Sequence, residues 1–166
     1  MLKFSYQSGL CTLVSKMTVK TDLQTLWDFI SLPENLSKIT PPEMDFRITF
    51  RSSLEGEKMY PGQIIAYKVK PLPVLSASWI TEITQVQERK FFIDEQRFGP
   101  YKFWHHQHII KEISGGVEMI DVVSYKLPLG WLGRLLGGGM VKKQLTKIFS
   151  YREAQMNKIF PDSAAG

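Results

Sequence analysis

The chain has 166 residues, of which 43% are hydrophobic and 22% charged, a composition typical of one globular domain. No apolar run approaches the roughly 20 residues that cross a bilayer, and the N-terminal residues do not resemble a secretory signal. The net charge of +5 is spread along the chain without a nucleic-acid-binding motif. We therefore expect a single domain over residues 1–166, with an ordered core at about 10–160, and no nucleic-acid partner.

Cysteine usage and the basic residues bear on location and partners. The single cysteine, Cys11, precludes an intramolecular disulfide and favours a cytoplasmic location. The densest basic residues lie on the C-terminal helix predicted below, where we expect a solvated face; the alternatives are contact with a membrane surface or an anionic ligand, and contact with nucleic acid. These residues are Lys142, Lys143, Lys147, Arg152 and Lys158.

The first half of the chain begins with a strand and two short helices. Alternation of apolar and polar residues predicts a strand over Leu10–Lys20. Asp22 offers an N-cap for a short amphipathic helix over residues 22–31. Pro33 begins a second short helix, Pro33–Ile39, because proline is tolerated in the first turn.

Six further strands and a long helix follow. The strands are predicted at residues 46–50, 62–70, 74–88, 91–98, 102–113 and 117–127. After them, Leu129–Leu136 reads as a short amphipathic segment, and Met140–Phe160 as a long helix with one apolar stripe. The glycines Gly137–Gly139 between them predict a break, interpreted as a hinge that lets the segment with Trp131 and Leu135 close as a lid.

This order of elements predicts an α+β fold. A seven-stranded curved antiparallel sheet cannot leave a whole apolar face in water, and the long C-terminal helix is the element large enough to cover it. We therefore expect the sheet to wrap around that helix, with the two short helices after the first strand closing one end. A cavity between sheet and helix follows from this arrangement.

One strand carries all three histidines of the chain. In the segment Phe103–Ile110, the period of two places Trp104, His106 and His108 on one face and His105 on the other, outward face. The first face is too polar for a plain core and too apolar for a plain surface. We interpret it as the lining of a pocket.

Neighbouring strands bring carboxylates to the same face. Asp94, Gln96 and Asp121 share it if the strands alternate regularly. Three interpretations remain open: a hydrogen-bonded layer that fixes strand register, a recognition patch in an apolar pocket, and a metal or acid–base site. In the third, His106 and His108 act with Asp121 or Asp94 as ligands or as a proton-transferring pair.

The chain resembles the START and birch-pollen-allergen-like superfamily, also called SRPBCC or polyketide cyclase-like, which has the helix-grip fold. The resemblance rests on Phe-Ile-Asp-Glu-Gln-x-x-Gly-Pro-Tyr-x-x-Trp-x-His-x-His from Phe92, Gly-Gly-x-x-Met-x-Asp-x-Val-x-Tyr-x-Leu-Pro from Gly115, and Phe-x-Tyr-Arg from Phe149. These segments are similar to a bacterial branch whose members are labelled ligand-binding proteins or cell division inhibitors. One departure is Gly137–Gly139, where that branch runs more continuously into the last helix.

We predict that the protein binds a hydrophobic small molecule, a lipid or an aromatic, polyketide-like compound. The expected ligand-binding residues are Trp79, Asp94, Gln96, Trp104, His106, His108, Asp121 and Tyr125. One alternative is a polyketide cyclase or dehydratase that uses a His–Asp pair drawn from His106, His108 and Asp121; another is a regulatory protein linked to cell division. No metal or cofactor is predicted, and open sheet edges permit a monomer or a homodimer.

Overall fold

The computed structural model describes residues 1–72 and 75–162; the side chains of residues 71, 72, 75, 131, 134 and 136 lie outside this description. Within these residues the chain forms eight strands, two α-helices and two short 3-10 helices, η1 and η2. In chain order they are β1 (Leu2–Gln7), β2 (Leu10–Val19), α1 (Leu23–Ile30), η1 (Pro33–Ile39), η2 (Pro42–Met44), β3 (Arg47–Arg51), β4 (Gln63–Leu72), β5 (Leu75–Gln87), β6 (Phe91–Phe98), β7 (Phe103–Ile113), β8 (Gly116–Lys126) and α2 (Gly130–Ile159).

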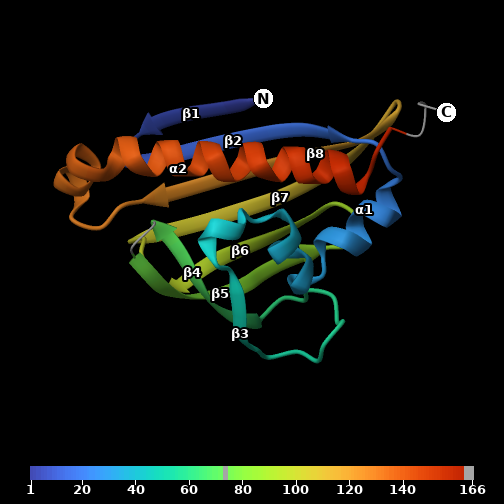
Figure 1. Cartoon of the computed structure of the whole chain (residues 1–166), viewed down its shortest axis with the longest axis horizontal. Helices are drawn as coiled ribbons and strands as arrows, with labels where there is room; N and C mark the ends of the chain where they lie inside the picture. The colour runs from blue at the N-terminus through green and yellow to red at the C-terminus, as the bar shows by residue number, and fades with distance from the viewer. Residues whose placement is uncertain (73–74, 163–166) are drawn as a thin grey trace.

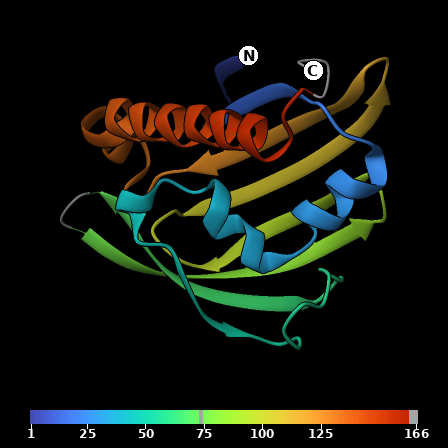
Figure 2. The ribbon, with the colours of Figure 1, turned by 45° about the vertical axis from the view of Figure 1, so that its right-hand side comes forward.

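All eight strands belong to one antiparallel sheet in the order β1-β2-β8-β7-β6-β5-β4-β3. The sheet curves, and α2 lies across its concave side beside β2 and β8 (Figure 1). The short helices lie on the same side as α2, over the other half of the sheet (Figure 2). This is the sheet wrapped around a helix that the order of elements predicts.

The short helices begin and end where the sequence indicates. The Asp22 side chain accepts a hydrogen bond from the Thr25 backbone N–H at 2.9 Å and so caps α1. Leu26 and Trp27 of α1 are buried against the sheet. The Asn35 side chain of η1 donates a hydrogen bond to the Phe29 carbonyl at 2.8 Å, which fixes the angle between the two helices.

The apolar core is divided into separate clusters along the concave side. One cluster, which contains Trp27, Met119 and Met156, packs α1 and the end of α2 on the sheet. Another joins Leu145 and Phe149 of α2 to β2 and β8. Between these clusters the concave side carries polar groups, because one inward position of β6, two of β7 and one of β8 hold aspartate or histidine.

Strand β1 was not predicted. Its three apolar residues, Leu2, Phe4 and Tyr6, alternate over too short a stretch to stand out from a polar segment. It pairs with β2 through a turn at Ser8 and Gly9, which both have positive φ. The sheet therefore has eight strands instead of seven, and the remaining predicted strands lie within a few residues of their observed bounds; Val74, expected to begin the strand at residues 74–88, lies outside the described residues.

The predicted break at Gly137–Gly139 was wrong. Helix α2 runs without interruption from Gly130 to Ile159. The cost of about 1 kcal/mol for each helical glycine is a local preference, and packing of a long helix on a sheet overrides it. The side chain of Trp131, assigned to a lid, lies outside the described residues. Across residues 1–72 and 75–162, each helix is too short or too polar to cross a lipid bilayer.

Candidate ligand cavity and its polar cluster

A cavity of about 400 Å³ lies between the concave side of the sheet, the short helices and α2. Most of its wall is apolar or aromatic. Representative residues are Phe29, Leu36, Ile65, Tyr67, Trp79, Ile83, Phe92, Tyr101, Trp104, Met119, Val141 and Ile148. The polar exceptions gather mainly on one side, where Asp94, His106, His108 and Arg152 reach the wall.

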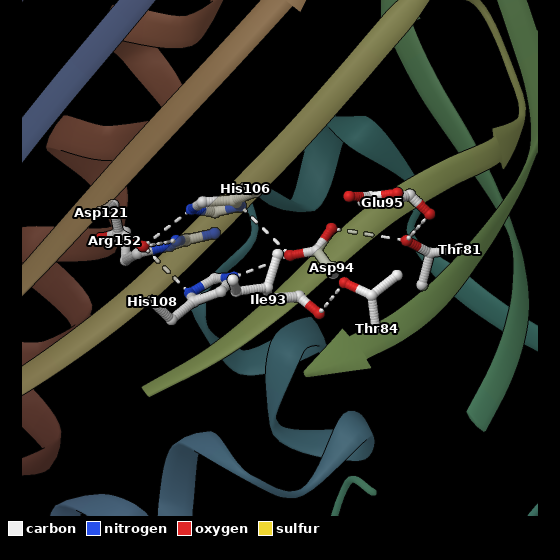
Figure 3. A network of polar contacts seen from close by, with 9 residues as sticks. All are labelled: Thr81, Thr84, Ile93, Asp94, Glu95, His106, His108, Asp121 and Arg152. Atoms are coloured by element: carbon white, nitrogen blue, oxygen red, sulfur yellow. Dashed lines mark hydrogen bonds and ion pairs between the residues drawn. The ribbon is translucent and has the colours of Figure 1, made fainter. Parts of the chain in front are cut away.

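The register of three strands brings the polar cluster together. Asp94 of β6 lies opposite His106 of β7, and His108 of β7 lies opposite Asp121 of β8. Cross-strand neighbours in an antiparallel pair have their Cβ atoms about 4.5–5.5 Å apart, so the four side chains meet on one face. In Figure 3 the two imidazoles lie between the two carboxylates. Their ring centroids are 3.7 Å apart.

Each imidazole contacts both carboxylates. His106 Nε2 lies 2.9 Å from Asp121 Oδ1, and His106 Nδ1 lies 3.5 Å from Asp94 Oδ2. His108 Nδ1 lies 3.0 Å from Asp121 Oδ1, and His108 Nε2 lies 2.9 Å from Asp94 Oδ2. The other oxygen of Asp94 accepts a hydrogen bond from the Thr81 hydroxyl at 3.4 Å. The cluster is therefore a closed ring of two acids and two imidazoles.

Arg152 of α2 completes the cluster from the opposite layer. Its guanidinium donates to Asp121 Oδ1 at 3.2 Å, and both side chains are almost fully buried. The expectation that Arg152 belongs to a solvated helix face is therefore wrong. The residue follows the apolar positions Leu145 and Phe149 and precedes Met156 on the buried stripe, so the helix period carries it inward. A charged residue on the apolar stripe of a helix is the sequence signal that could have identified Arg152 as part of the site.

The cluster shifts the pKa values of the two histidines in opposite directions. Burial, together with the neighbouring His108, lowers the pKa of His106 from 6.5 to about 4, so this ring is neutral near pH 7. Burial also disfavours the charged form of His108, but hydrogen bonds to Asp121 and Asp94 outweigh it and raise its pKa. Burial acts against the charge of both aspartates too. The pKa of Asp94 is nevertheless below its usual range, because the carboxylate accepts a hydrogen bond from His108. The pKa of Asp121 is also below its usual range, because of the neighbouring positive charge of Arg152.

The structure places the eight residues expected to bind a ligand in two groups. Trp79, Asp94, Trp104, His106 and His108 line the cavity. The other three stand behind the wall. Asp121 is fully buried beneath the histidines, Tyr125 packs with the aromatic residues around Trp104, and the Gln96 amide bonds to the Tyr101 backbone, where it closes the turn between β6 and β7.

Several cavity residues were missed by the sequence reasoning. Besides Arg152, they include Tyr67, Tyr101 and Asn35. Burial raises the pKa of both tyrosines, so their hydroxyls stay protonated. Tyr67 lies at an inward position of β4, and alternation alone could have identified it. His105, expected on the outward face, pairs with Glu95 at 2.9 Å and is absent from the cavity wall.

This arrangement can do three things chemically. The wall can take up an apolar molecule, and the cluster can orient a polar end of it. A neutral imidazole beside a carboxylate can accept a proton. Asp94, His106 and His108 also offer one ligand atom each, and these atoms lie within 4.8 Å of one another.

Comparisons with known proteins identify the fold. No family model and no curated protein matches the chain. Among solved structures, protein Ms6760 from Mycobacterium smegmatis has a TM-score of 0.66 and 14% identity, over 96% of this chain and 98% of that one. A protein from Arthrobacter aurescens has a TM-score of 0.66 and 11% identity, over 94% and 91%. Ara h 8.0201, a Bet v 1-like protein, has a TM-score of 0.58 and 14% identity, over 90% and 99%.

Identities this low establish a shared architecture and leave the chemistry open. The likeness nevertheless extends over nearly the full length of each chain, and it matches the curved sheet, the short helices and the long C-terminal helix. The protein therefore has the helix-grip α+β fold, with a curved antiparallel sheet wrapped around a long C-terminal helix.

Proposed function

We propose that the protein binds a hydrophobic small molecule, a lipid or an aromatic compound, in the cavity between the sheet and α2. The observation that carries the proposal is a cavity of about 400 Å³ with an apolar wall and one polar cluster. Small-molecule sites are commonly about 300–1,000 Å³ in volume and combine apolar walls with a few convergent polar groups.

The wall supplies affinity and the cluster supplies orientation. Trp79, Trp104 and Tyr101 contact one another at one end of the cavity, with ring centroids 4.8–5.5 Å apart, and offer an aromatic surface. The Trp79 indole N–H is buried and has no hydrogen-bond partner among the described residues. Buried donors are normally paired, so an acceptor atom on the bound molecule would satisfy it.

The test begins with mass spectrometry of the freshly purified protein under native conditions. A co-purified mass of a few hundred daltons that is lost on denaturation identifies the ligand class. Binding of the neutral fluorescent probe N-phenylnaphthylamine then measures uptake directly. Protein that carries no such mass and does not bind the probe would contradict the proposal.

A matched pair of variants localises the binding to the cavity. Gly137 lines the cavity, and a Cβ atom there would meet no atom within 4 Å, so Gly137→Phe places its ring in the open space. Gly139 is equally free of neighbours but exposed, so Gly139→Phe controls for the change in helix propensity. We expect probe binding to be lost in the first variant and retained in the second.

An acid–base enzyme, as in a polyketide cyclase or dehydratase, is the second candidate. It is favoured by the neutral imidazole of His106, which reaches the cavity wall between two ionised carboxylates. Incubation of the co-purified compound with the protein would show conversion as a mass change. His106→Gln should abolish conversion but preserve binding if His106 transfers a proton; a carrier shows no conversion in the wild type.

The remaining expectations about context belong to the same proposal. A monomer or homodimer in the cytoplasm is consistent with the open sheet edges at β1 and β3 and with one cysteine in the chain. A regulatory role remains the third reading. A partner that is captured equally by the wild type and by Gly137→Phe would favour it over both functions of the cavity.

A further inference from the structure

The carboxylate that each ring nitrogen faces determines where the imidazole protons lie. Asp121 is fully buried and paired with Arg152, so it is ionised and can only accept hydrogen bonds. His106 Nε2 and His108 Nδ1 lie 2.9 and 3.0 Å from its Oδ1 atom. Both nitrogens must therefore carry a hydrogen and donate it to Asp121.

The opposite nitrogens then present lone pairs when the rings are neutral. His106 Nδ1 and His108 Nε2 both face Asp94 Oδ2, at 3.5 and 2.9 Å, so three acceptor atoms converge (Figure 3). Such a convergence is unfavourable unless a cation lies among the atoms. One proton, carried by His108 Nε2, satisfies the shorter contact and leaves His106 Nδ1 facing another acceptor.

We propose that Asp94, His106 and His108 bind a divalent first-row transition-metal ion such as zinc or iron(II). The ligand atoms already lie within 4.8 Å of one another, and a tetrahedral zinc ion with bonds of about 2.0–2.1 Å needs them about 3.3 Å apart. Two histidines and one carboxylate are an established ligand set for these ions. The sequence left a metal site among its open interpretations without predicting a metal, and the present inference stands independently of the proposed hydrophobic ligand.

The groups around the three ligands support this assignment. Metal-binding histidines usually donate their second N–H to a carboxylate, which fixes the tautomer, and Asp121 accepts from both rings here. Thr81 holds the second oxygen of Asp94 in the same way. Arg152 neutralises the charge of Asp121. A divalent ion bound to Asp94 and the two neutral imidazoles would therefore leave a net charge of one positive unit at the site. An exogenous anion or a water-derived hydroxide could neutralise it.

The remaining coordination positions are accessible from the cavity. Asp94, His106 and His108 all line its wall, whereas Asp121 lies behind them. A water molecule or an oxygen atom of a bound compound could therefore complete the coordination of the ion.

Titration of chelator-treated protein with Zn²⁺ by calorimetry tests the proposal, with Co²⁺ absorption spectra to report the geometry. We expect one ion per chain. Loss of a group that only hydrogen-bonds to a metal ligand weakens metal binding by about 10–100-fold. Asp94→Asn and His108→Gln change the ligands themselves, so each should weaken zinc binding by more than this. His105→Ala is the matched control: His105 lies on the same strand beside Glu95, but on the other face. It should bind zinc as the wild type does.

Nitrogen-15 spectra of the histidine rings decide the matter in the wild-type protein, even if the variants misfold. Zinc should shift the resonances of His106 Nδ1 and His108 Nε2 and leave His106 Nε2 and His108 Nδ1 protonated. Zinc that shifts neither of the first two nitrogens, or binds only at His105, overturns the proposal. Equally tight binding by folded Asp94→Asn and wild type would do the same.

Discussion

Arg152 supplies the only guanidinium that contacts the polar cluster within the described residues. Asp121 has no exposure to water, so its charge depends on this partner and on the two imidazoles. Burial of an unpaired carboxylate is far more costly than burial of a paired one. The arginine therefore keeps Asp121 ionised, and through it fixes the protons of both histidines.

Arg152→Met should destabilise the protein by about 3–5 kcal/mol, because it removes one partner of a buried pair and leaves Asp121 uncompensated. Urea unfolding measures the change. Arg47→Met is the matched control, since Arg47 pairs with Asp45 at 2.7 Å while 71% of its side chain is exposed, and its loss should destabilise the protein far less. Equal effects of the two substitutions would mean that Asp121 does not depend on Arg152.

The metal-free protein should be most stable near pH 6.5. The pKa of His106 is about 4 in the folded protein and 6.5 in the unfolded chain. Between these pH values the unfolded chain therefore binds more protons, so the free energy of unfolding falls as the pH drops from 6.5 to 4. The pKa of His108 is raised, so its contribution is present below 6.5 and is lost as pH rises through its folded value. Asp94 and Asp121, with lowered pKa values, steepen the loss below about pH 4.

Urea unfolding with a chelator present measures this pH dependence. Between pH 6.5 and 4.5 the His106 contribution amounts to about 2 kcal/mol, at 1.36 kcal/mol for each pKa unit. His106→Gln should remove most of this acid limb, since glutamine does not titrate. A variant that keeps the full limb would show that His106 is not the group held neutral.

Alternation along single strands was enough to predict most of the cluster. It placed Asp94, His106, His108 and Asp121 on one face before their register was known, because strand neighbours in a meander are close in sequence. Arg152 could not be found in this way. Its contact with Asp121 depends on how α2 is seated on the sheet, and that position is set by packing between residues far apart in the chain.

At the scale of elements, local signals fixed the short helices and most strands. The range of η1, for example, is the one predicted from Pro33 and the following prolines. The failures were β1, the short 3-10 helix η2 and the glycine segment. The turn at Ser8 and Gly9, with positive φ at both residues, is the signal that could have revealed the β1–β2 hairpin. The continuity of α2 is a tertiary effect that glycine propensities oppose.

Glycine substitutions in α2 should separate these influences. Gly139→Ala should stabilise the protein by about 1 kcal/mol, because the position is helical and a Cβ atom there meets nothing within 4 Å. Gly133→Ala should destabilise it, since the Cβ atom would collide with the Pro128 carbonyl oxygen, where β8 turns into α2. Thermal unfolding measures both. Destabilisation by Gly139→Ala would indicate that helix propensity does not decide stability at this position.

At the scale of the whole molecule, the cavity exists only in the folded chain. Its wall is assembled from the short helices, the strands β3 to β8 and α2, so it draws on residues from Phe29 to Arg152. The unfolded chain cannot offer this surface. A compound that occupies the cavity therefore binds the native state alone and stabilises it by mass action.

N-phenylnaphthylamine at 100 times its dissociation constant should therefore raise the free energy of unfolding by about 2.7 kcal/mol, as measured by urea unfolding with and without the probe. Gly137→Phe should be more stable than the wild type without probe, because its ring fills open space and a helical glycine is removed, but it should gain nothing further from the probe. Gly139→Phe should show the full gain. If the probe stabilised Gly137→Phe as much as the wild type, its binding site would lie elsewhere on the molecule, and the cavity would not be the place where the protein takes up hydrophobic compounds.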